Sequence, residues 1–286
     1  MSRGASSSRR TVAQIAPAAA VLTVFFLLPG AYFFLVSFWQ IKRYKLVRET
    51  TLENYVDVVR EYLPSIGFSI TLALIIAAIT TSFAFAIAYL IRFREGRLGT
   101  LILFVALTTL FGGYLVKIYA WKTLLGSTGI INQALMLIGV IEQPLDWLLY
   151  TPLAVVITLV HFLLPFAILP VHASLRGIAD APVDAARDLG ASRFRIFAEV
   201  VLPQCETGVV TAFALTFFIS VGDYVTAQLV GGPNTLMVGN FMQSQFINRL
   251  NAPIGSALAF STLLATLIVF LALRYGFRLA LGGLRR

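Results

Sequence analysis

The sequence contains one cysteine, two histidines and few charged residues. The single cysteine, Cys205, excludes an internal disulfide and any cysteine-cluster metal site, and we interpret it as a small residue at the start of a helix. His161 and His172 are separated by ten residues with no carboxylate among them, which is too far for one shared metal ion. We therefore expect no metal site and interpret both histidines as packing or hydrogen-bonding residues.

The sequence also lacks the loop that binds nucleotide phosphates. No Gly-x4-Gly-Lys-Ser/Thr element occurs, and the stretch Gly231-Gly232-Pro233-Asn234 has neither the lysine nor the hydroxyl that hold phosphates and magnesium. The chain is therefore not expected to hydrolyse ATP by that route. The apolar segments also offer no serine with a base and an orienting acid nearby, which a catalytic serine requires. These absences predict a protein that is not an enzyme, with no catalytic residue and no cofactor of its own.

Charged residues make up 12% of the chain, against about 25% in soluble domains, whereas 58% of the residues are hydrophobic and the mean hydropathy is +0.86. This composition predicts a polytopic membrane protein. The formal net charge of +9 would indicate nucleic acid in a soluble protein, but here the arginines lie between apolar runs. We expect anionic membrane lipid as their partner and no nucleic acid.

Membrane-spanning helices need about 20 mostly apolar residues each. Six runs meet this requirement: residues 15–38, 67–91, 98–119, 148–172, 209–230 and 254–273. The sequence thus predicts an all-α fold with a transmembrane domain over residues 15–286. The apolar run over residues 129–138 is too short to span, so we expect an interfacial or re-entrant helix there.

Two patterns within these runs concern packing. The second run carries small residues at near-regular helical spacing, which predicts a close-packed helix face in lipid: Ala73, Ala77, Thr81, Ala84 and Ala88. The fourth run contains Pro165 and Pro170, which predict a kink.

Basic residues mark the cytoplasmic side of a membrane protein. An arrangement with both termini in the cytoplasm places 14 of the 22 basic residues inside, and it includes a cytoplasmic tail over residues 1–14. Lys42, Arg43, Lys45 and Arg48 in the first outer loop oppose this orientation, but the later loops favour it. The first apolar run is longer than a secretory signal core, so we expect it to be retained as a membrane helix.

The longest polar insert in the second half of the chain lies in a loop over residues 174–207. Pro182 stands near the start of a predicted helix, where its missing N–H costs nothing, and Gly190 supplies a left-handed cap that ends this helix. Two short helices with a hinge at Gly190 are therefore expected.

The second short helix is expected to begin at Ser192, whose hydroxyl suits an N-cap. Because Pro203 disfavours a helical conformation at the residue before it, Leu202 is expected to be extended and to close the unit. The apolar face between these ends is predicted to carry Phe194, Phe197 and Val201, and the residues off that face are Arg193, Arg195 and Glu199.

The insert has a fixed spacing: Asp184-Ala185-Ala186, three residues, Gly190, nine residues, then Val200-Val201-Leu202-Pro203. It resembles the cytoplasmic loop of permease subunits in ABC importers, whose pattern is Glu-Ala-Ala, three residues, Gly, nine residues and Ile-x-Leu-Pro. In that family the loop forms a coupling helix that docks on the ATPase subunit. The resemblance implies a type I ABC importer permease fold and assigns ATPase coupling to Asp184, Ala185, Ala186, Gly190, Leu202 and Pro203. The alternative is an ordinary amphipathic connector between membrane helices.

Asp223 lies inside the fifth predicted span, where a carboxylate costs roughly 2.5 to 3.5 kcal/mol on insertion scales. Such a residue usually faces a cavity or a partner, and neighbouring aromatic rings suit an organic cation by cation–π attraction. The alternative is a structural role, in which Asp223 pairs with Lys117 or caps broken backbone beside it. The candidate substrate-pathway residues are Asp223, Tyr224, Trp121, Tyr119 and Lys117.

Three further stretches resemble permeases of spermidine/putrescine importers: residues 114–121, residues 222–226 leading to 231–233, and residues 239–246. This resemblance implies a subunit of the bacterial inner membrane that imports a small organic cation from the periplasm, with a polyamine such as spermidine or putrescine as the expected cargo. The implied partners are two ATPase subunits, a second permease and a periplasmic binding protein. The binding protein would deliver cargo to the outer segments, residues 40–66, 122–147 and 231–253.

Two other functions stay open on the sequence. Permeases of importers for an opine, an amino-acid derivative or ferric ion have similar stretches. A secondary transporter that works without nucleotide would show inverted repeats with matching broken helices, and no such repeat is evident in the sequence.

Overall fold

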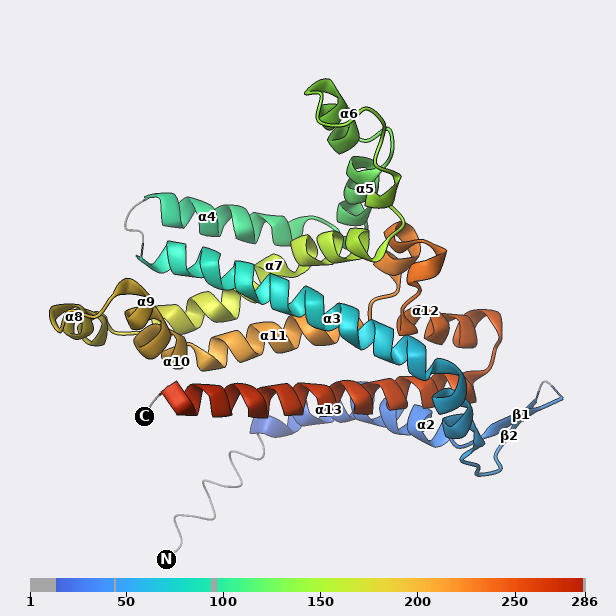
Figure 1. Cartoon of the computed structure of the whole chain (residues 1–286). Helices are drawn as coiled ribbons and strands as arrows, with labels where there is room; N and C mark the ends of the chain where they lie inside the picture. Colours follow the sequence, from blue (N-terminus) through green and yellow to red (C-terminus); the bar gives the residue numbers. More distant parts are fainter. Residues whose placement is uncertain (1–13, 44, 94–96, 285–286) are drawn as a thin grey trace, which may run out of the picture. The chain divides into compact units, whose positions relative to one another are not determined.

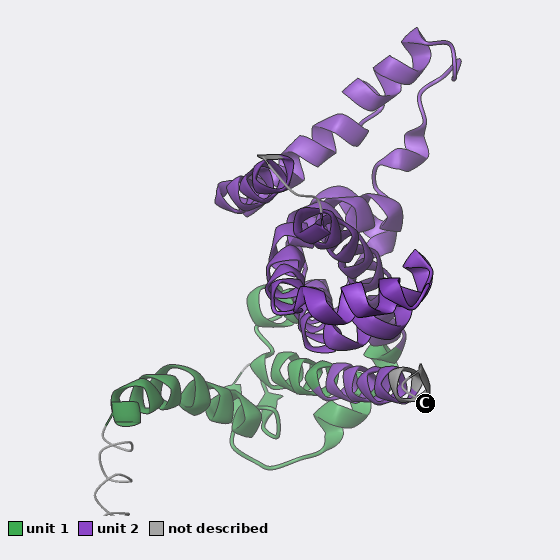
Figure 2. Ribbon diagram, turned by 90° about the vertical axis from the view of Figure 1, so that its left-hand side faces the viewer, with its two compact units in different colours: residues 1–63, 242–263 green, residues 64–241, 264–286 purple. Residues whose placement is uncertain are grey.

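The structure is a computed structural model that describes residues 14–43, 45–93 and 97–284. These residues are mostly helical and fall into two compact units, coloured separately in Figure 2. The first unit contains residues 1–63 and 242–263, and the second contains residues 64–241 and 264–286. The predicted cytoplasmic tail, apart from Gln14, lies outside the described residues.

The first unit begins with a helix over Gln14–Val36 that is long and apolar enough to cross a membrane, as predicted for residues 15–38. This helix includes η1 (Thr23–Leu27) and α2 (Leu28–Val36). An antiparallel hairpin of β1 (Gln40–Lys42) and β2 (Lys45–Val47) follows, in which Ile41 pairs with Leu46, and it is an addition to the predicted helical fold. The Asn54 side chain then donates to the carbonyl oxygens of Ser37 and Trp39 at 2.8 and 2.7 Å, which ties the end of the first helix to α3.

Helix α3 (Glu53–Phe93) has 41 residues and begins well before the predicted residue 67. At about 1.5 Å per residue it is about 60 Å long, about twice the hydrocarbon thickness of a membrane. Its first turns carry charged residues, so they were not part of the apolar run that marked the predicted span. Thr51 accepts a hydrogen bond from the Glu53 N–H at 3.1 Å and so helps to start the helix. Most of the predicted outer loop 40–66 is therefore helix. The predicted small-residue face is confirmed as buried: Ala73, Ala77, Thr81, Ala84 and Ala88.

Residues 98–119, the third predicted span, do not form a single straight helix (Figure 1). Helices α4 (Arg97–Thr108) and α5 (Tyr114–Leu125) belong to segments that meet at 102°, with η2 (Thr109–Phe111) between them. Gly112 and Gly113 are extended, with ψ of 122° and 141°, and this ends the helical hydrogen-bond pattern. A short helix was predicted over residues 129–138, and α6 (Ile130–Leu137) confirms it.

The fourth predicted span corresponds to α7 (Pro152–Arg176), which is long and apolar enough to cross a membrane, follows η3 (Asp146–Leu148) and contains Pro165 and Pro170. The fifth, residues 209–230, is interrupted. Helix α11 (Glu206–Val221) ends at Gly222, and the chain resumes in η5 (Ala227–Gly231), η6 (Pro233–Thr235), α12 (Val238–Gln243) and η7 (Ser244–Asn248). Helix α13 (Ala252–Leu284) supplies the last predicted span.

Four of the described helices are long and apolar enough to cross a membrane, and the count rises to six if each bent pair is one span. The second bent pair joins Arg193–Gln204 to Glu206–Val221 at 71°. The prediction of six spans therefore agrees with the upper count, with two of the six broken.

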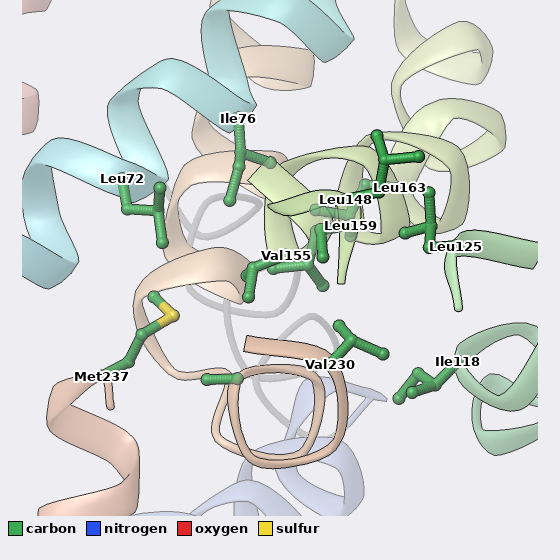
Figure 3. Packing of buried hydrophobic residues seen from close by; sticks show 12 residues of the cluster. Leu72, Ile76, Ile118, Leu125, Leu148, Val155, Leu159, Leu163, Val230 and Met237 are labelled. Carbon is green, nitrogen blue, oxygen red and sulfur yellow. The ribbon is translucent and has the colours of Figure 1, made fainter. Parts of the chain in front are cut away.

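The core of the second unit packs α3, α5, α7 and η5 together around buried aliphatic side chains (Figure 3). Acyl chains are as apolar as leucine, so moving a leucine from lipid into this core gives no hydrophobic gain. The helices are therefore held together by close van der Waals contact. The labelled members of this cluster are Leu72, Ile76, Ile118, Leu125, Leu148, Val155, Leu159, Leu163, Val230 and Met237. This core positions the two sites described next, both of which lie in the second unit.

Candidate functional site

The first site is the polar insert, defined here as the elbow, residues 180–204. It starts with α8 (Asp180–Asp188), and Gly190 follows with φ of +79°, which confirms the predicted left-handed residue. The N–H of Gly190 donates to the Arg187 carbonyl at 2.9 Å, and the N–H of Ala191 donates to the Ala186 carbonyl at 3.0 Å. These two bonds form a Schellman cap, so the helix ends as the sequence predicts.

Ser192 confirms the predicted N-cap of the second short helix, because its Oγ accepts from the Arg195 N–H at 3.3 Å. That helix consists of α9 (Arg193–Arg195), η4 (Ile196–Val201) and α10 (Leu202–Gln204). The prediction of an extended Leu202 was wrong, since its φ and ψ are −60° and −44°. The π-helical turns of η4 account for the difference: a widened turn relieves the clash between a proline ring and the preceding turn, so the helix continues through Pro203.

The predicted apolar face of this helix is only partly buried. Val201 is buried, and the Phe197 ring packs edge-on against the rings of Phe85 and Tyr89 at 5.5 and 6.2 Å. Phe194 is 77% exposed and Leu189, beside the hinge, is 88% exposed. The elbow therefore presents large apolar side chains to its surroundings on either side of Gly190.

The six residues to which the resemblance assigns ATPase coupling differ in burial. Asp184, Ala185 and Gly190 are exposed, Ala186 and Leu202 are half-buried, and Pro203 is buried. One end of the elbow is held to α3 by Arg92, which contacts Asp180 at 2.5 Å. The other end is held by Glu206, which contacts Arg278 of α13 at 3.3 Å. The exposed part of the motif is thus a surface anchored at both ends.

The second site is the break between α11 and η5, where Asp223 is 8% exposed. Its carboxylate accepts hydrogen bonds from the Tyr114 hydroxyl, from the Thr226 hydroxyl at 3.2 Å, and from the N–H groups of Thr226 and Ala227 at 3.2 and 3.4 Å. The carboxylate therefore caps the helical segment that follows the break, where a negative charge is favourable. This geometry corresponds to the alternative in which Asp223 has a structural role and caps broken backbone beside it.

The other pathway candidates divide into two groups. Lys117 and Trp121 lie on the face of α5 that also carries Tyr114, and they contact α7 through the rings of Phe162 and His161. Tyr119 is 54% exposed on another face of α5, and Tyr224 is 38% exposed. No ion pair joins Lys117 to Asp223 in the part of the chain that the structure describes, so the alternative in which these two residues pair does not apply.

The segment 239–240 also holds the break, in addition to the hydrogen bonds of Asp223. The Asn240 side chain donates to the Tyr224 carbonyl at 2.9 Å and accepts from the Met237 N–H at 2.9 Å. A Cβ on Gly239 would lie 3.0 Å from the Asp223 carbonyl oxygen, so a larger residue would force the break to shift. Backbone groups of the break are therefore bonded by two side chains, those of Asp223 and Asn240.

The family scan matches residues 12–278 to the model described as "Binding-protein-dependent transport system inner membrane component". The chain belongs to this family. It is an ABC importer permease, a multi-pass inner-membrane subunit of a transport complex that works with a periplasmic binding protein, and it is not the catalytic subunit. The predicted family is confirmed.

Relatives of the permease include the "Spermidine/putrescine transport system permease protein PotB" of Haemophilus influenzae, 32% identical over 226 residues, which cover 78% of this chain and 79% of that protein. The "Spermidine/putrescine transport system permease protein PotC" of Escherichia coli is 36% identical over 75 residues, 26% of this chain and 28% of that protein. A solved bacterial ABC transporter "involved in the import of the acidic polysaccharide alginate" has the same fold, with a TM-score of 0.72 at 15% identity, covering 96% of each chain.

Sequence reasoning missed three residues of the second site: Tyr114, Phe162 and Thr226. Tyr114 lies one helical turn before Lys117 and Thr226 lies three residues after Asp223, so helical spacing was the signal available for both. Phe162 had no such signal, because it is one of many large apolar residues in α7. Of the permease's two histidines, His161 packs edge-on against Trp121 at 5.7 Å, and the described residues contain no cluster of His, Cys, Asp and Glu that would hold a metal ion.

Proposed function

We propose that the permease moves a small organic cation, a polyamine such as spermidine or putrescine, from the periplasm to the cytoplasm. The observation that carries this proposal is its similarity to the PotB protein over more than three quarters of both chains. A buried carboxylate among aromatic rings of α5 and α7 supports it, because such surroundings suit an ammonium group. The relative that imports an acidic polysaccharide shows that the shared fold alone fits cargo of opposite charge.

The elbow is proposed as the surface that couples the permease to an ATPase. The spacing of its motif supports this role. So does the exposure of Leu189 and Phe194, which lie on either side of the left-handed Gly190. Apolar side chains on a surface fixed at both ends suit a docking partner. ATP-driven movement of that partner would be transmitted to α3 through Arg92 and to α13 through Arg278.

The working complex is proposed to hold two ATPase subunits, a second permease of a different sequence and a periplasmic binding protein. Similarity to both PotB and PotC supports a pair of related permeases. The basic residues of the later loops support an orientation with both termini and the elbow in the cytoplasm. Cargo would then pass from the outer segments 122–147 and 231–253 toward the break at Asp223.

The pathway residues are proposed to be Asp223, Tyr224, Trp121, Tyr119 and Lys117. In this arrangement Asp223 supplies negative potential while it caps the broken helix, and Tyr224 and Tyr119 offer exposed rings. Opening of the break during transport would expose Asp223 to the passing cation.

The test is a reconstituted importer with its own binding protein, ATPase and second permease. We expect the binding protein to bind spermidine or putrescine, and vesicles to accumulate that polyamine only when ATP is supplied. Uptake driven by an ion gradient without the ATPase would contradict the coupling. A binding protein that ignores polyamines and takes an opine or ferric ion would contradict the cargo but leave the coupling intact.

A further inference from the structure

Lys117 is buried without a hydrogen-bond partner. Its side chain is 8% exposed, and its Nζ makes no hydrogen bond with any residue that the structure describes. An ammonium group carries three donors, and leaving it unpaired in a membrane protein is costly. Its surroundings must therefore stabilise the ammonium in another way.

Aromatic rings supply that stabilisation. The Nζ of Lys117 lies 5.3 Å from the centroid of the Phe162 ring, within the range of a cation–π contact. The Tyr114 ring lies 4.6 Å from Phe162, and the Tyr114 hydroxyl donates to the Asp223 carboxylate. A lysine ammonium thus rests on an aromatic wall whose Tyr114 is bonded to a carboxylate.

We propose that the Phe162 face is a binding site for a primary ammonium group of the cargo, and that Lys117 occupies this site when cargo is absent. The inference rests on the proposed polyamine cargo and adds a site to it. A lysine side chain is a four-carbon alkylammonium, and putrescine is a four-carbon chain with an ammonium at each end. A site that holds the first therefore has the chemistry to hold either end of the second.

The two ammonium groups exclude each other, because like charges in one buried site repel strongly. Cargo must therefore displace Lys117 from Phe162 before it binds. This displacement lowers the apparent affinity of the resting permease for its cargo, since only the fraction of molecules with an empty site is competent to bind. Lys117 thus acts as a tethered competitor of the cargo.

The test measures binding of n-butylammonium and of spermidine to the assembled importer in lipid nanodiscs, without the binding protein. Lys117→Met removes the competing charge and keeps an apolar chain, and we expect it to lower the dissociation constant of both probes about threefold to thirtyfold. Phe162→Leu should weaken binding, and Lys117→Met should give no gain in that background. Lys122→Met is the comparison, because Lys122 lies 5.8 Å over the Tyr150 ring on the same helix, and any effect of its loss should be the same with and without Phe162→Leu.

Two results decide the inference. Lys117→Met with unchanged or weaker butylammonium binding would overturn it, even if spermidine uptake by the wild type is normal. If Lys117→Met binds butylammonium more tightly than the wild type and the wild type does not carry polyamines, the site is supported and the proposed cargo is rejected. If Lys117→Met fails to assemble, Lys117→Gln removes the same charge with a polar side chain, and the same two readings apply.

Discussion

The elbow and the break at Asp223 belong to the same unit but are held together by different kinds of contact. Gly190 and Ser192 form their caps with residues three to five positions away along the chain. Asp223 depends on Tyr114, which is 109 residues earlier, and the break also depends on Asn240. Local bonds survive when a segment moves as a whole, whereas distant bonds fix a segment to the core. The ion pairs that link the elbow to distant residues, through Asp180 and Glu206, lie at its ends and not at Gly190 or Ser192. The difference supports the proposed roles, in which the elbow transmits movement and the break controls what passes.

Burial separates the two sites in the same way. Leu189 and Phe194 of the elbow are 88% and 77% exposed, whereas Asp223 is 8% exposed. Substitutions at the break should therefore alter transport through buried charge, and substitutions in the elbow should alter coupling through backbone shape. Three variants, in decreasing order of expected effect, test this difference.

The largest effect is expected from Asp223→Asn, which replaces a charged acceptor shared by four donors. Hydrogen bonds to a charged group contribute about 1.5 to 3 kcal/mol each, so we expect polyamine uptake to fall about hundredfold. Co-purification with the ATPase should fall less, because the elbow lies on other elements. Asp146→Asn, an exposed change of the same type on η3, is the control. Unchanged uptake kinetics would remove Asp223 from the pathway.

A smaller effect is expected from Gly190→Val. No atom lies within 4 Å of a Cβ at this position, so the cost comes from the backbone and its φ of +79° alone. A left-handed conformation costs about 1 to 2 kcal/mol for a residue with a side chain, and we expect uptake to fall about tenfold with the same amount of protein in the membrane. Gly190→Asn should retain most uptake, because asparagine tolerates this conformation. Normal uptake by the valine variant would show that the hinge does not couple.

The smallest effect is expected from Ser192→Ala. The Ser192 hydroxyl accepts one long hydrogen bond in an exposed position, and loss of an N-cap costs about 0.5 to 2 kcal/mol. Because this bond is long and exposed, we expect a cost of about 1 kcal/mol, so ATP hydrolysis stimulated by loaded binding protein should fall about fivefold, and Ser192→Asp should restore it. A loss as large as that of the valine variant at Gly190 would mean that Ser192 contacts the ATPase directly.

The fold was predictable where a helix is apolar and uninterrupted. The runs over 15–38 and 148–172 became helices with nearly the predicted ends, since hydropathy alone marks them. The bend at Gly112 was not predicted, and the break at Gly222 was left open as one alternative for Asp223, because apolar composition continues across both. The first turns of α3 were missed for the opposite reason: they are helical but charged.

In the two sites, too, some residues were predictable from the local sequence and others were not. Gly190 and Ser192 were predicted with their conformations because capping depends on a residue type and its near neighbours. Leu202 was predicted wrongly, because the rule for residues before proline does not anticipate the wide turn of η4. Phe162 was not predicted at all, since nothing in its local sequence distinguishes it from other apolar residues of α7.

The sequence by itself determined the membrane character of this permease, its family and the caps of its elbow, because composition, spacing and short-range hydrogen bonds are all properties of neighbouring residues. Only the tertiary structure decided that Lys117 lies on Phe162 and that Asp223 caps a broken helix with the help of Tyr114. These contacts join α5, α7 and the segment after α11. Their formation depends on where the chain bends, and the bends depend on packing between segments that are far apart in sequence.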